Sequence, residues 1–169
     1  NAGNLTLTNC TLLTNSAGSG GAVHNAATGT LTVNGCTFDG NAAGADGGSI
    51  QNLNTATVTN STIANGFATT GGAIENTSGT LTLINSTLFN NNAATGSNLH
   101  RTAGTLSASN DIVLGGAGGG NDIDGTVTSS NGHNLVGTTG VALTGSQSGT
   151  ITGVNPVNVL AAPLAFADN

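Results

Sequence analysis

The chain has 169 residues, a formal net charge of −6 and only 5% charged residues, and Arg101 is its single Lys or Arg side chain. Nucleic acid and anionic membrane surfaces are bound through clusters of Lys and Arg, so the composition excludes both classes of partner. No continuous apolar stretch is long enough for a transmembrane helix, and we predict no membrane insertion.

Short segments that alternate apolar and hydroxyl side chains recur along the chain. The equivalent apolar positions follow one another at intervals of 25 or 26 residues: Leu5, Leu31, Ala56, Leu81 and Leu106. Such alternation is typical of a half-buried strand, with Leu and Val pointing inward and Thr outward. A repeat this short cannot enclose a core alone, so we expect stacked repeats that share one apolar column.

Glycine and asparagine separate the strands within each repeat. One corner is predicted at Asn9, Gly35, Asn60 and Asn85, because these residue types tolerate a left-handed backbone. Gly-Gly signatures that end at Val23, Ile50 and Ile74 are predicted to form the second bend of each rung. We therefore predict an all-β fold, a right-handed parallel β-helix (solenoid) with rungs of about 25 residues and three short strands per rung.

The regularity of the repeat predicts how the chain is organised. We expect regular rungs in residues 1–125, with a Gly-rich loop at 115–121, and closing or irregular rungs in residues 126–169. The chain begins without Met, and the repeat is already present at Leu5. We interpret the sequence as a piece of a longer parent protein, since terminal caps normally protect such stacks.

Two sets of equivalent residues predict structural contacts between rungs. Asn25, Asn52 and Asn76 follow the Gly-Gly signatures at the same offset, and we expect them to form a hydrogen-bonded ladder. Cys10 and Cys36 share one position in successive rungs. A rung spacing of about 4.8 Å suits the Cα separation of a disulfide, so the sequence leaves open either a disulfide or two small buried thiols.

His24, Gln51, Glu75 and His100 form one column after the Gly-Gly signatures, and we predict that it faces solvent. Glu75 and His100 are candidate metal ligands because they lie on adjacent rungs. Two ligands do not make a metal site of a known type, so we interpret them as a solvated surface pair.

Asp122 and Asp124 follow the Gly-rich loop and are also candidate metal ligands. Their spacing resembles a calcium-binding nonapeptide, but that motif must recur in successive turns to form sites. We interpret the segment as a loop insertion and predict no cofactor, with adventitious Ca²⁺ binding as the alternative.

Two neighbouring outward columns consist almost entirely of Thr: Thr6, Thr32, Thr57, Thr82 and Ser107 in one, and Thr30, Thr55, Thr80 and Thr105 in the other. They resemble the surface of ice-binding β-solenoids. Thr is also an ordinary residue of exposed strands, and the next column is interrupted by Asn34 and Ile84. We interpret the columns as structural and keep ice binding as an alternative.

Many parallel β-helices act on polysaccharides, so a carbohydrate-active or glycan-binding protein is the other alternative. Hydrolysis of a glycosidic bond requires two carboxylates near one bond, and lyase chemistry on acidic sugars requires Lys or Arg. Lys is absent from the sequence. The acids are scattered over different rungs, at Asp39, Asp46, Glu75, Asp111, Asp122, Asp124 and Asp168. We predict that the chain is not an enzyme.

The repeats GTLTLINSTLFNN (79–91) and GGAIEN (71–76) resemble those of secreted bacterial β-helix proteins, including polymorphic outer-membrane proteins. The segments NGHNLVG (131–137), GVNP (153–156) and PLAFADN (163–169) resemble the closing part of choice-of-anchor surface proteins, in which Asp usually stands at the position of Asn155. The resemblance implies export, attachment to the cell surface and adhesive or structural work, and it carries no catalytic motif.

Together these features predict an extracellular or cell-surface structural module, such as a segment of an adhesin or fibre. The expected partners are copies of the chain itself or neighbouring rungs of a longer chain, with surface glycans as a further alternative. Open strand edges also predict end-to-end stacking into filaments.

Overall fold

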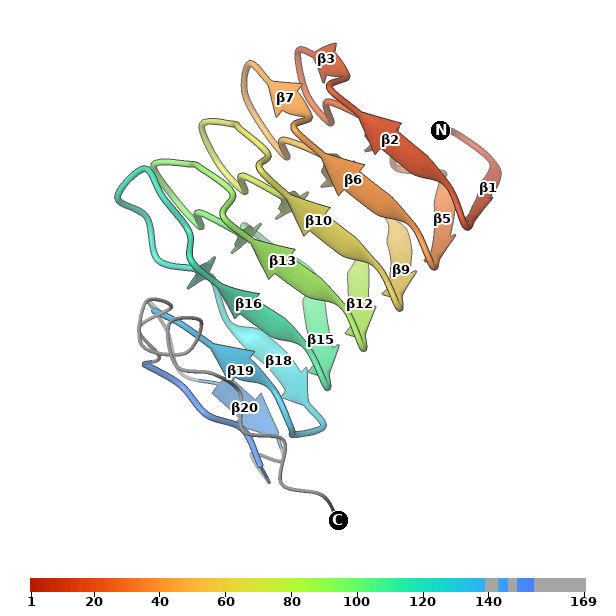
Figure 1. Cartoon of the computed structure of the whole chain (residues 1–169). Coiled ribbons are helices and arrows are strands. Elements are labelled where there is room, and N and C mark those ends of the chain that lie inside the picture. The colour runs from red at the N-terminus through yellow and green to blue at the C-terminus, as the bar shows by residue number, and fades with distance from the viewer. Residues whose placement is uncertain (139–142, 146–148, 154–169) are drawn as a thin grey trace.

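The computed structural model describes residues 1–138, 143–145 and 149–153. In these residues the fold is all-β, with parallel sheets stacked as a β-solenoid of about five turns and rungs about 25 residues apart (Figure 1). The prediction of a parallel β-helix is confirmed. No helix of the described part could cross a membrane. Asn155, Asp168 and the segment 163–169 lie outside the described residues.

Three parallel sheets run along the stack, and each of the first five rungs contributes one strand to each sheet. The first sheet contains, in spatial order, β1 (Asn4–Thr8), β5 (Thr30–Asn34), β9 (Thr55–Thr59), β12 (Thr80–Ile84), β15 (Thr105–Ser109), β18 (Val127–Ser130) and β20 (Leu143–Gly145). The second contains β2 (Thr11–Leu13), β6 (Thr37–Asp39), β10 (Thr62–Ala64), β13 (Thr87–Phe89), β16 (Ile112–Leu114) and β19 (Leu135–Val136).

The third sheet contains β4 (Val23–Asn25), β8 (Ile50–Asn52), β11 (Ile74–Asn76), β14 (Leu99–Arg101) and β17 (Ile123–Asp124). A two-stranded sheet, formed by β3 (Ser16–Ala17) and β7 (Ala42–Ala43), lies where the first two rungs pass from the second sheet to the third. Each strand of the three main sheets therefore comes from a different rung than its neighbour, which places equivalent residues above one another.

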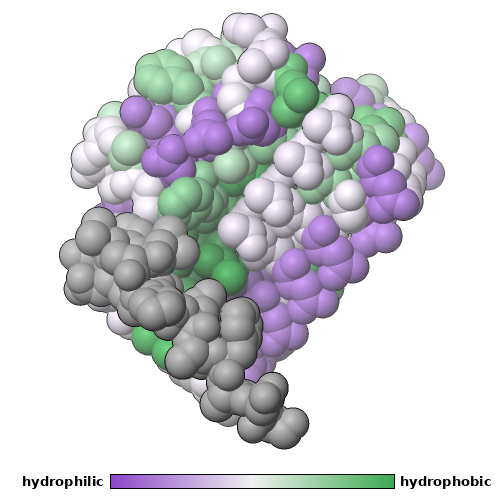
Figure 2. Space-filling model, in the orientation of Figure 1, coloured by the Kyte–Doolittle hydropathy of each residue, from purple (hydrophilic) through white to green (hydrophobic). Residues whose placement is uncertain are grey.

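The core is one apolar column in the interior of the solenoid. In the first sheet, Leu31 pairs with Ala56, Ala56 with Leu81 and Leu81 with Leu106, and all four side chains are fully buried. Removing one such Leu side chain from water stabilises the fold by roughly 1.5–3 kcal/mol. The predicted superposition of residues one repeat apart is confirmed. On the outer surface, residues of similar hydropathy form bands that run along the stack, as Figure 2 shows.

The predicted corners between the first and second sheets have left-handed backbones. Asn9, Gly35, Asn60 and Asn85 have φ values of 51°, 65°, 51° and 52°. The exposed Asn side chains also bond between rungs: Asn60 donates from Nδ2 to Asn34 Oδ1 at 3.2 Å, and Asn85 donates from Nδ2 to Asn60 Oδ1 at 3.3 Å. These corners are confirmed, and their side chains connect successive rungs.

The Gly-rich segment 115–121 is the ordinary connection between the second and third sheets. Ala117 pairs with Asn92 of the preceding rung, and its amide donates to Asn91 O at 2.8 Å. The sequence separation from Val113 to Ile123 is one residue shorter than the equivalent separation from Leu88 to Leu99 in the preceding rung. The interpretation of this segment as an insertion is therefore wrong.

The predicted ladder of asparagines lies inside the corner between the third and first sheets. Asn25 donates from Nδ2 to Asn52 Oδ1 at 2.8 Å, and Asn52 donates from Nδ2 to Asn76 Oδ1 at 2.7 Å. All three residues are fully buried. Their Nδ2 atoms also donate to backbone carbonyls, such as that of Thr80 from Asn52. The ladder is confirmed, and it satisfies polar backbone groups that the corner leaves without a strand partner.

We expect Asn52→Ala to lower the free energy of unfolding by ~3 kcal/mol, because it leaves buried polar groups of Asn25 and Asn76 without a partner. Urea unfolding followed by circular dichroism measures this change. The matched control is Asn34→Ala, which removes an exposed amide and should change the free energy by less than about 0.5 kcal/mol. Equal losses in the two variants would contradict a structural role specific to the buried ladder.

Candidate functional site

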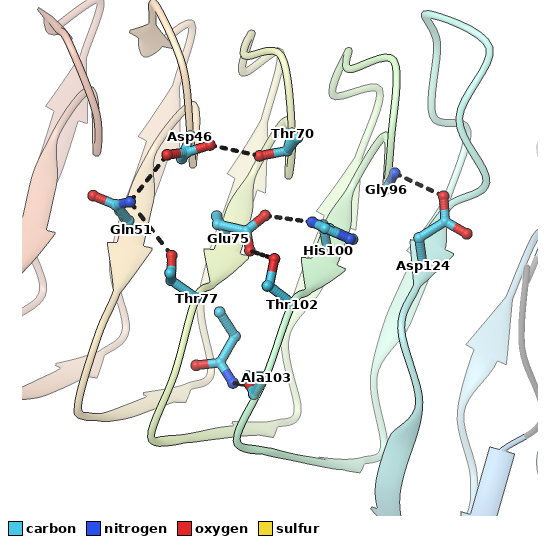
Figure 3. Close-up of polar contacts among 11 residues, drawn as sticks. Asp46, Gln51, Thr70, Glu75, Thr77, Gly96, His100, Thr102, Ala103 and Asp124 are labelled. Atoms are coloured by element: carbon cyan, nitrogen blue, oxygen red, sulfur yellow. Dashed lines mark hydrogen bonds and ion pairs between the residues drawn. The ribbon is translucent and has the colours of Figure 1, made fainter.

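Polar side chains form a continuous column on the outer side of the third sheet (Figure 3). The strand register places His24 beside Gln51, Gln51 beside Glu75 and Glu75 beside His100, as the repeat predicts. The strand register also places Asp124 beside His100. We call these five residues the polar column, and it is the largest gathering of titratable groups on one sheet of the described residues.

The predicted exposure of this column is wrong for its central members. His24 is exposed, but Gln51 and Glu75 retain only 6% and 2% of their accessible surface. They are covered because the chain on both sides of the third sheet carries polar groups that bond to them. Gln51 bonds to Asp46, from the connection before its strand, and to Thr77, from the turn after the next strand, while Glu75 bonds to Thr102. Thr70 in turn bonds to Asp46.

Glu75 lies at the centre of the column, and both of its carboxylate oxygens are hydrogen-bonded. His100 Nδ1 lies 2.7 Å from Glu75 Oε2, and Thr102 Oγ1 donates to Glu75 Oε1 at 2.9 Å. The hydrogen bond with Glu75 raises the pKa of His100 from its usual value, against the opposing effect of burial. The pair is therefore a partly buried ion pair in which the carboxylate stabilises the imidazolium form.

Gln51 links the column to the connection that precedes its strand. Its Nε2 donates to Asp46 Oδ2 at 3.2 Å and to Thr77 Oγ1 at 3.4 Å, and Thr70 Oγ1 donates to Asp46 Oδ1 at 2.8 Å. Among the described residues, Gln51 Oε1 is buried without a hydrogen-bond partner, and it points away from Asp46 toward the neighbouring rung. The carboxylates of Asp46 and Glu75 are thus held by neutral donors and one histidine.

The candidates Asp122 and Asp124 are not brought together. Asp122 is buried, and its carboxylate accepts bonds from Gly116 N, Asn98 Nδ2 and Thr138 N at 2.6, 2.5 and 2.8 Å. Asp124 lies in the polar column and accepts bonds from Gly96 N at 3.0 Å and Asn121 Nδ2 at 2.9 Å. Both carboxylates therefore join neighbouring segments of the chain.

Of the four candidate metal ligands, only Glu75 and His100 touch. Within the described ranges, no group of three or more His, Cys, Asp or Glu side chains is placed to hold a metal ion. Carboxylates that already accept two or three hydrogen bonds offer few free lone pairs to a cation. The hydrogen bonds that Glu75, Asp122 and Asp124 accept connect them to neighbouring segments of the solenoid.

A second polar column lies at the start of the second sheet, and the repeat places Cys10, Cys36, Ser61 and Ser86 in it, whereas Asp111 and Asn134 were not predicted to belong to it. Each backbone amide donates to the side chain one rung further on: Cys10 to Cys36 Sγ, Cys36 to Ser61 Oγ, Ser61 to Ser86 Oγ, Ser86 to Asp111 Oδ1, and Asp111 to Asn134 Oδ1. Both cysteines are free thiols in the structure. The constant step of 25 residues from Cys36 was the signal that could have placed Asp111 here.

Asp111 is the unusual member of this column. It is 1% exposed, and it borders a small internal cavity together with Ser130 and Asn134. Burial raises the pKa of its carboxyl to about 7, although the amides of Ser86 and Ser109, which donate to it, favour the charged form. The carboxyl thus titrates near neutral pH inside the solenoid.

Comparisons with protein-family models, with curated proteins and with solved structures find no match to this chain.

Asp111→Ser places a serine in this position, as Ser86 stands there one rung earlier and Ser61 two rungs earlier. Because the folded state raises the pKa of Asp111 above 3.8, the wild-type chain should lose stability as the pH rises from about 4 to about 7, with a slope of up to ~1.4 kcal/mol per pH unit. The variant should lack this loss. Urea unfolding across that pH range measures both, and parallel profiles would contradict the assignment.

His100→Gln removes a second group whose titration makes the folded chain less stable as the pH rises. Since the pKa of His100 is raised above 6.5, its stabilising contribution is complete below that value and is lost as the pH rises through the raised pKa. We expect the variant to be less stable than the wild type by ~1 kcal/mol at about pH 5, and the difference to shrink toward pH 8. Exposed His24→Gln is the control, and an equal effect there would contradict a role of the Glu75 pair.

Proposed function

We propose that this chain is a non-enzymatic structural segment of an extracellular or cell-surface β-helix protein of bacterial type, such as an adhesin or fibre. In this function the stacked rungs act as a stiff spacer that holds other parts of the assembly at a fixed separation. The observation that carries the proposal is the use of the buried polar side chains: almost all of them join one rung to the next.

The hydrogen bonds of the titratable groups support this function. Glu75 contacts Thr102 and His100 of the next rung, Asp122 accepts from Asn98 of the preceding rung, and Asp111 accepts from Ser86 of the preceding rung. Groups that act on a substrate need free lone pairs or protons directed into an open site. Here those lone pairs stabilise the stack, which is what a spacer requires.

Stacking with a further rung is part of the proposal. In the described residues β1 pairs only with β5, so its outer edge has unpaired backbone groups. Leu5 and Leu7 are only partly buried, whereas their equivalents Leu31 and Val33 are fully buried. A strand edge with unpaired amides beside uncovered Leu side chains favours the addition of another strand. This edge has the strand direction and spacing to accept a further rung, from a longer chain or from a second copy.

The carbohydrate-active alternative has weaker support. Glu75 would be its acid or nucleophile, but the side chain is 98% buried and both oxygens are occupied by His100 and Thr102. A glycan would have to displace the covering turn to reach it. A surface that binds glycans weakly, without this site, remains compatible with an adhesive module.

A direct test is antibody labelling of the source organism. Antibodies raised against the purified chain should label intact cells, or fibres released from them, before permeabilisation, because the proposed module is exported. Antibodies against a cytosolic enzyme of the same cells provide the control and should label only permeabilised cells. Labelling by both antibodies only after permeabilisation would refute the proposed location.

A further inference from the structure

The outer face of the first sheet carries a regular array of hydroxyl groups. Two adjacent columns of Thr are in register over the four strands β5, β9, β12 and β15, and Ser107 is the one exception. One of the columns extends to Thr6 in β1. We call the outward threonines of this array the Thr face: Thr6, Thr30, Thr32, Thr55, Thr57, Thr80, Thr82 and Thr105.

The Thr face is open and uncharged. None of its residues is buried, and the five strands β1, β5, β9, β12 and β15 contain no Asp, Glu, Lys, Arg or His. Each Thr offers a methyl group and a hydroxyl group from a side chain with few rotamers, so little conformational entropy is lost when a partner orders it. Thr105 Oγ1 donates to Thr80 Oγ1 at 3.1 Å, so these two hydroxyls lie closer together than the strands that carry them.

The spacing of the array is set by the backbone. Neighbouring strands lie about 4.8 Å apart, and alternate residues of one strand lie about 6.7 Å apart. Water molecules in ice form tetrahedral hydrogen bonds of about 2.75 Å, so two waters bonded to a common third are about 4.5 Å apart, and the stacked layers repeat at about 7.3 Å. The backbone spacings that carry the threonines agree with the two ice spacings to within about a tenth in both directions.

We propose that the Thr face binds ice. Water anchored by the hydroxyls and ordered around the methyl groups can continue the crystal lattice, because the array has matching repeats in two dimensions. Only a partner with its own two-dimensional repeat can contact all the threonines equivalently. Ice binding by this face requires the fold alone, whether or not the chain is displayed at a cell surface.

Other occupants are less compatible with the composition of the Thr face. Flat polysaccharide surfaces are bound mainly through aromatic side chains, and the five strands contain no Phe, Tyr or Trp. The face also differs from the second sheet, where the outward column Thr11, Thr37, Thr62 and Thr87 stands alone beside Leu13, Asp39 and Phe89. The second sheet therefore provides an internal control of equal strand spacing.

The experiment measures thermal hysteresis and inhibition of ice recrystallisation by the full chain. The wild type should show both activities, because bound molecules force the ice surface between them to curve and so oppose its growth. Thr57→Tyr, at the centre of the Thr face, should lose them. Thr62→Tyr, on the second sheet of the same rung, should retain them. Circular dichroism spectra and melting temperatures equal to those of the wild type show that each variant folds.

Three results would overturn the proposal. The first is a folded wild-type chain without either activity. The second is an equal loss of activity in Thr57→Tyr and Thr62→Tyr, which would mean that the Thr face is not the site. The third is dimerisation of the wild type, measured by analytical ultracentrifugation, that Thr57→Tyr abolishes, which would make a second copy the occupant of the face.

Discussion

The in-register parallel pairing of equivalent strands is the interaction on which the whole structure depends. Once Leu31 pairs with Ala56 and Ala56 with Leu81, every other residue of those rungs also lies above its equivalent. The inward Leu and Val side chains then form one core, and the corner asparagines lie within hydrogen-bond reach of one another. A shift of a single residue would turn the apolar set outward, so burial of the column strongly opposes such a shift.

The same pairing explains which residue types are interchangeable at a position. The column of Cys36, Ser61, Ser86 and Asp111 varies in size and charge, yet each side chain supplies an acceptor to the amide of the rung before it. The column thus preserves a hydrogen-bonding role while the residue changes. Asp111 meets that role with a carboxylate, and its raised pKa follows from placing a charge where the neighbouring rungs place a neutral hydroxyl.

The sequence was sufficient to predict the fold, the left-handed corners and the ladder of Asn25, Asn52 and Asn76, because each depends on position within the repeat. It failed where a property depends on segments outside the repeat pattern. Glu75 is on the outer side of its strand, as predicted, but adjoining turns and connections cover it, and alternation along one strand cannot reveal such a cover. Likewise, the glycines of 115–121 indicated an insertion, whereas backbone pairing at Ala117 shows the regular path.

In this solenoid, stability and the chemistry of the outer surface depend on different side chains. In most small domains these two requirements compete. Polar groups inside and at the corners bond chiefly to the adjacent rung, so stability is approximately a sum of contacts between nearest neighbours. The outward side chains of the first sheet contribute little to those contacts, but they inherit the spacing of the backbone beneath them. The pairing of the strands therefore makes the outer surface periodic, whichever residue types its outward side chains have. Thr suits such an exposed strand on its own account, and the proposed ice binding uses the two-dimensional spacing that the pairing imposes on it.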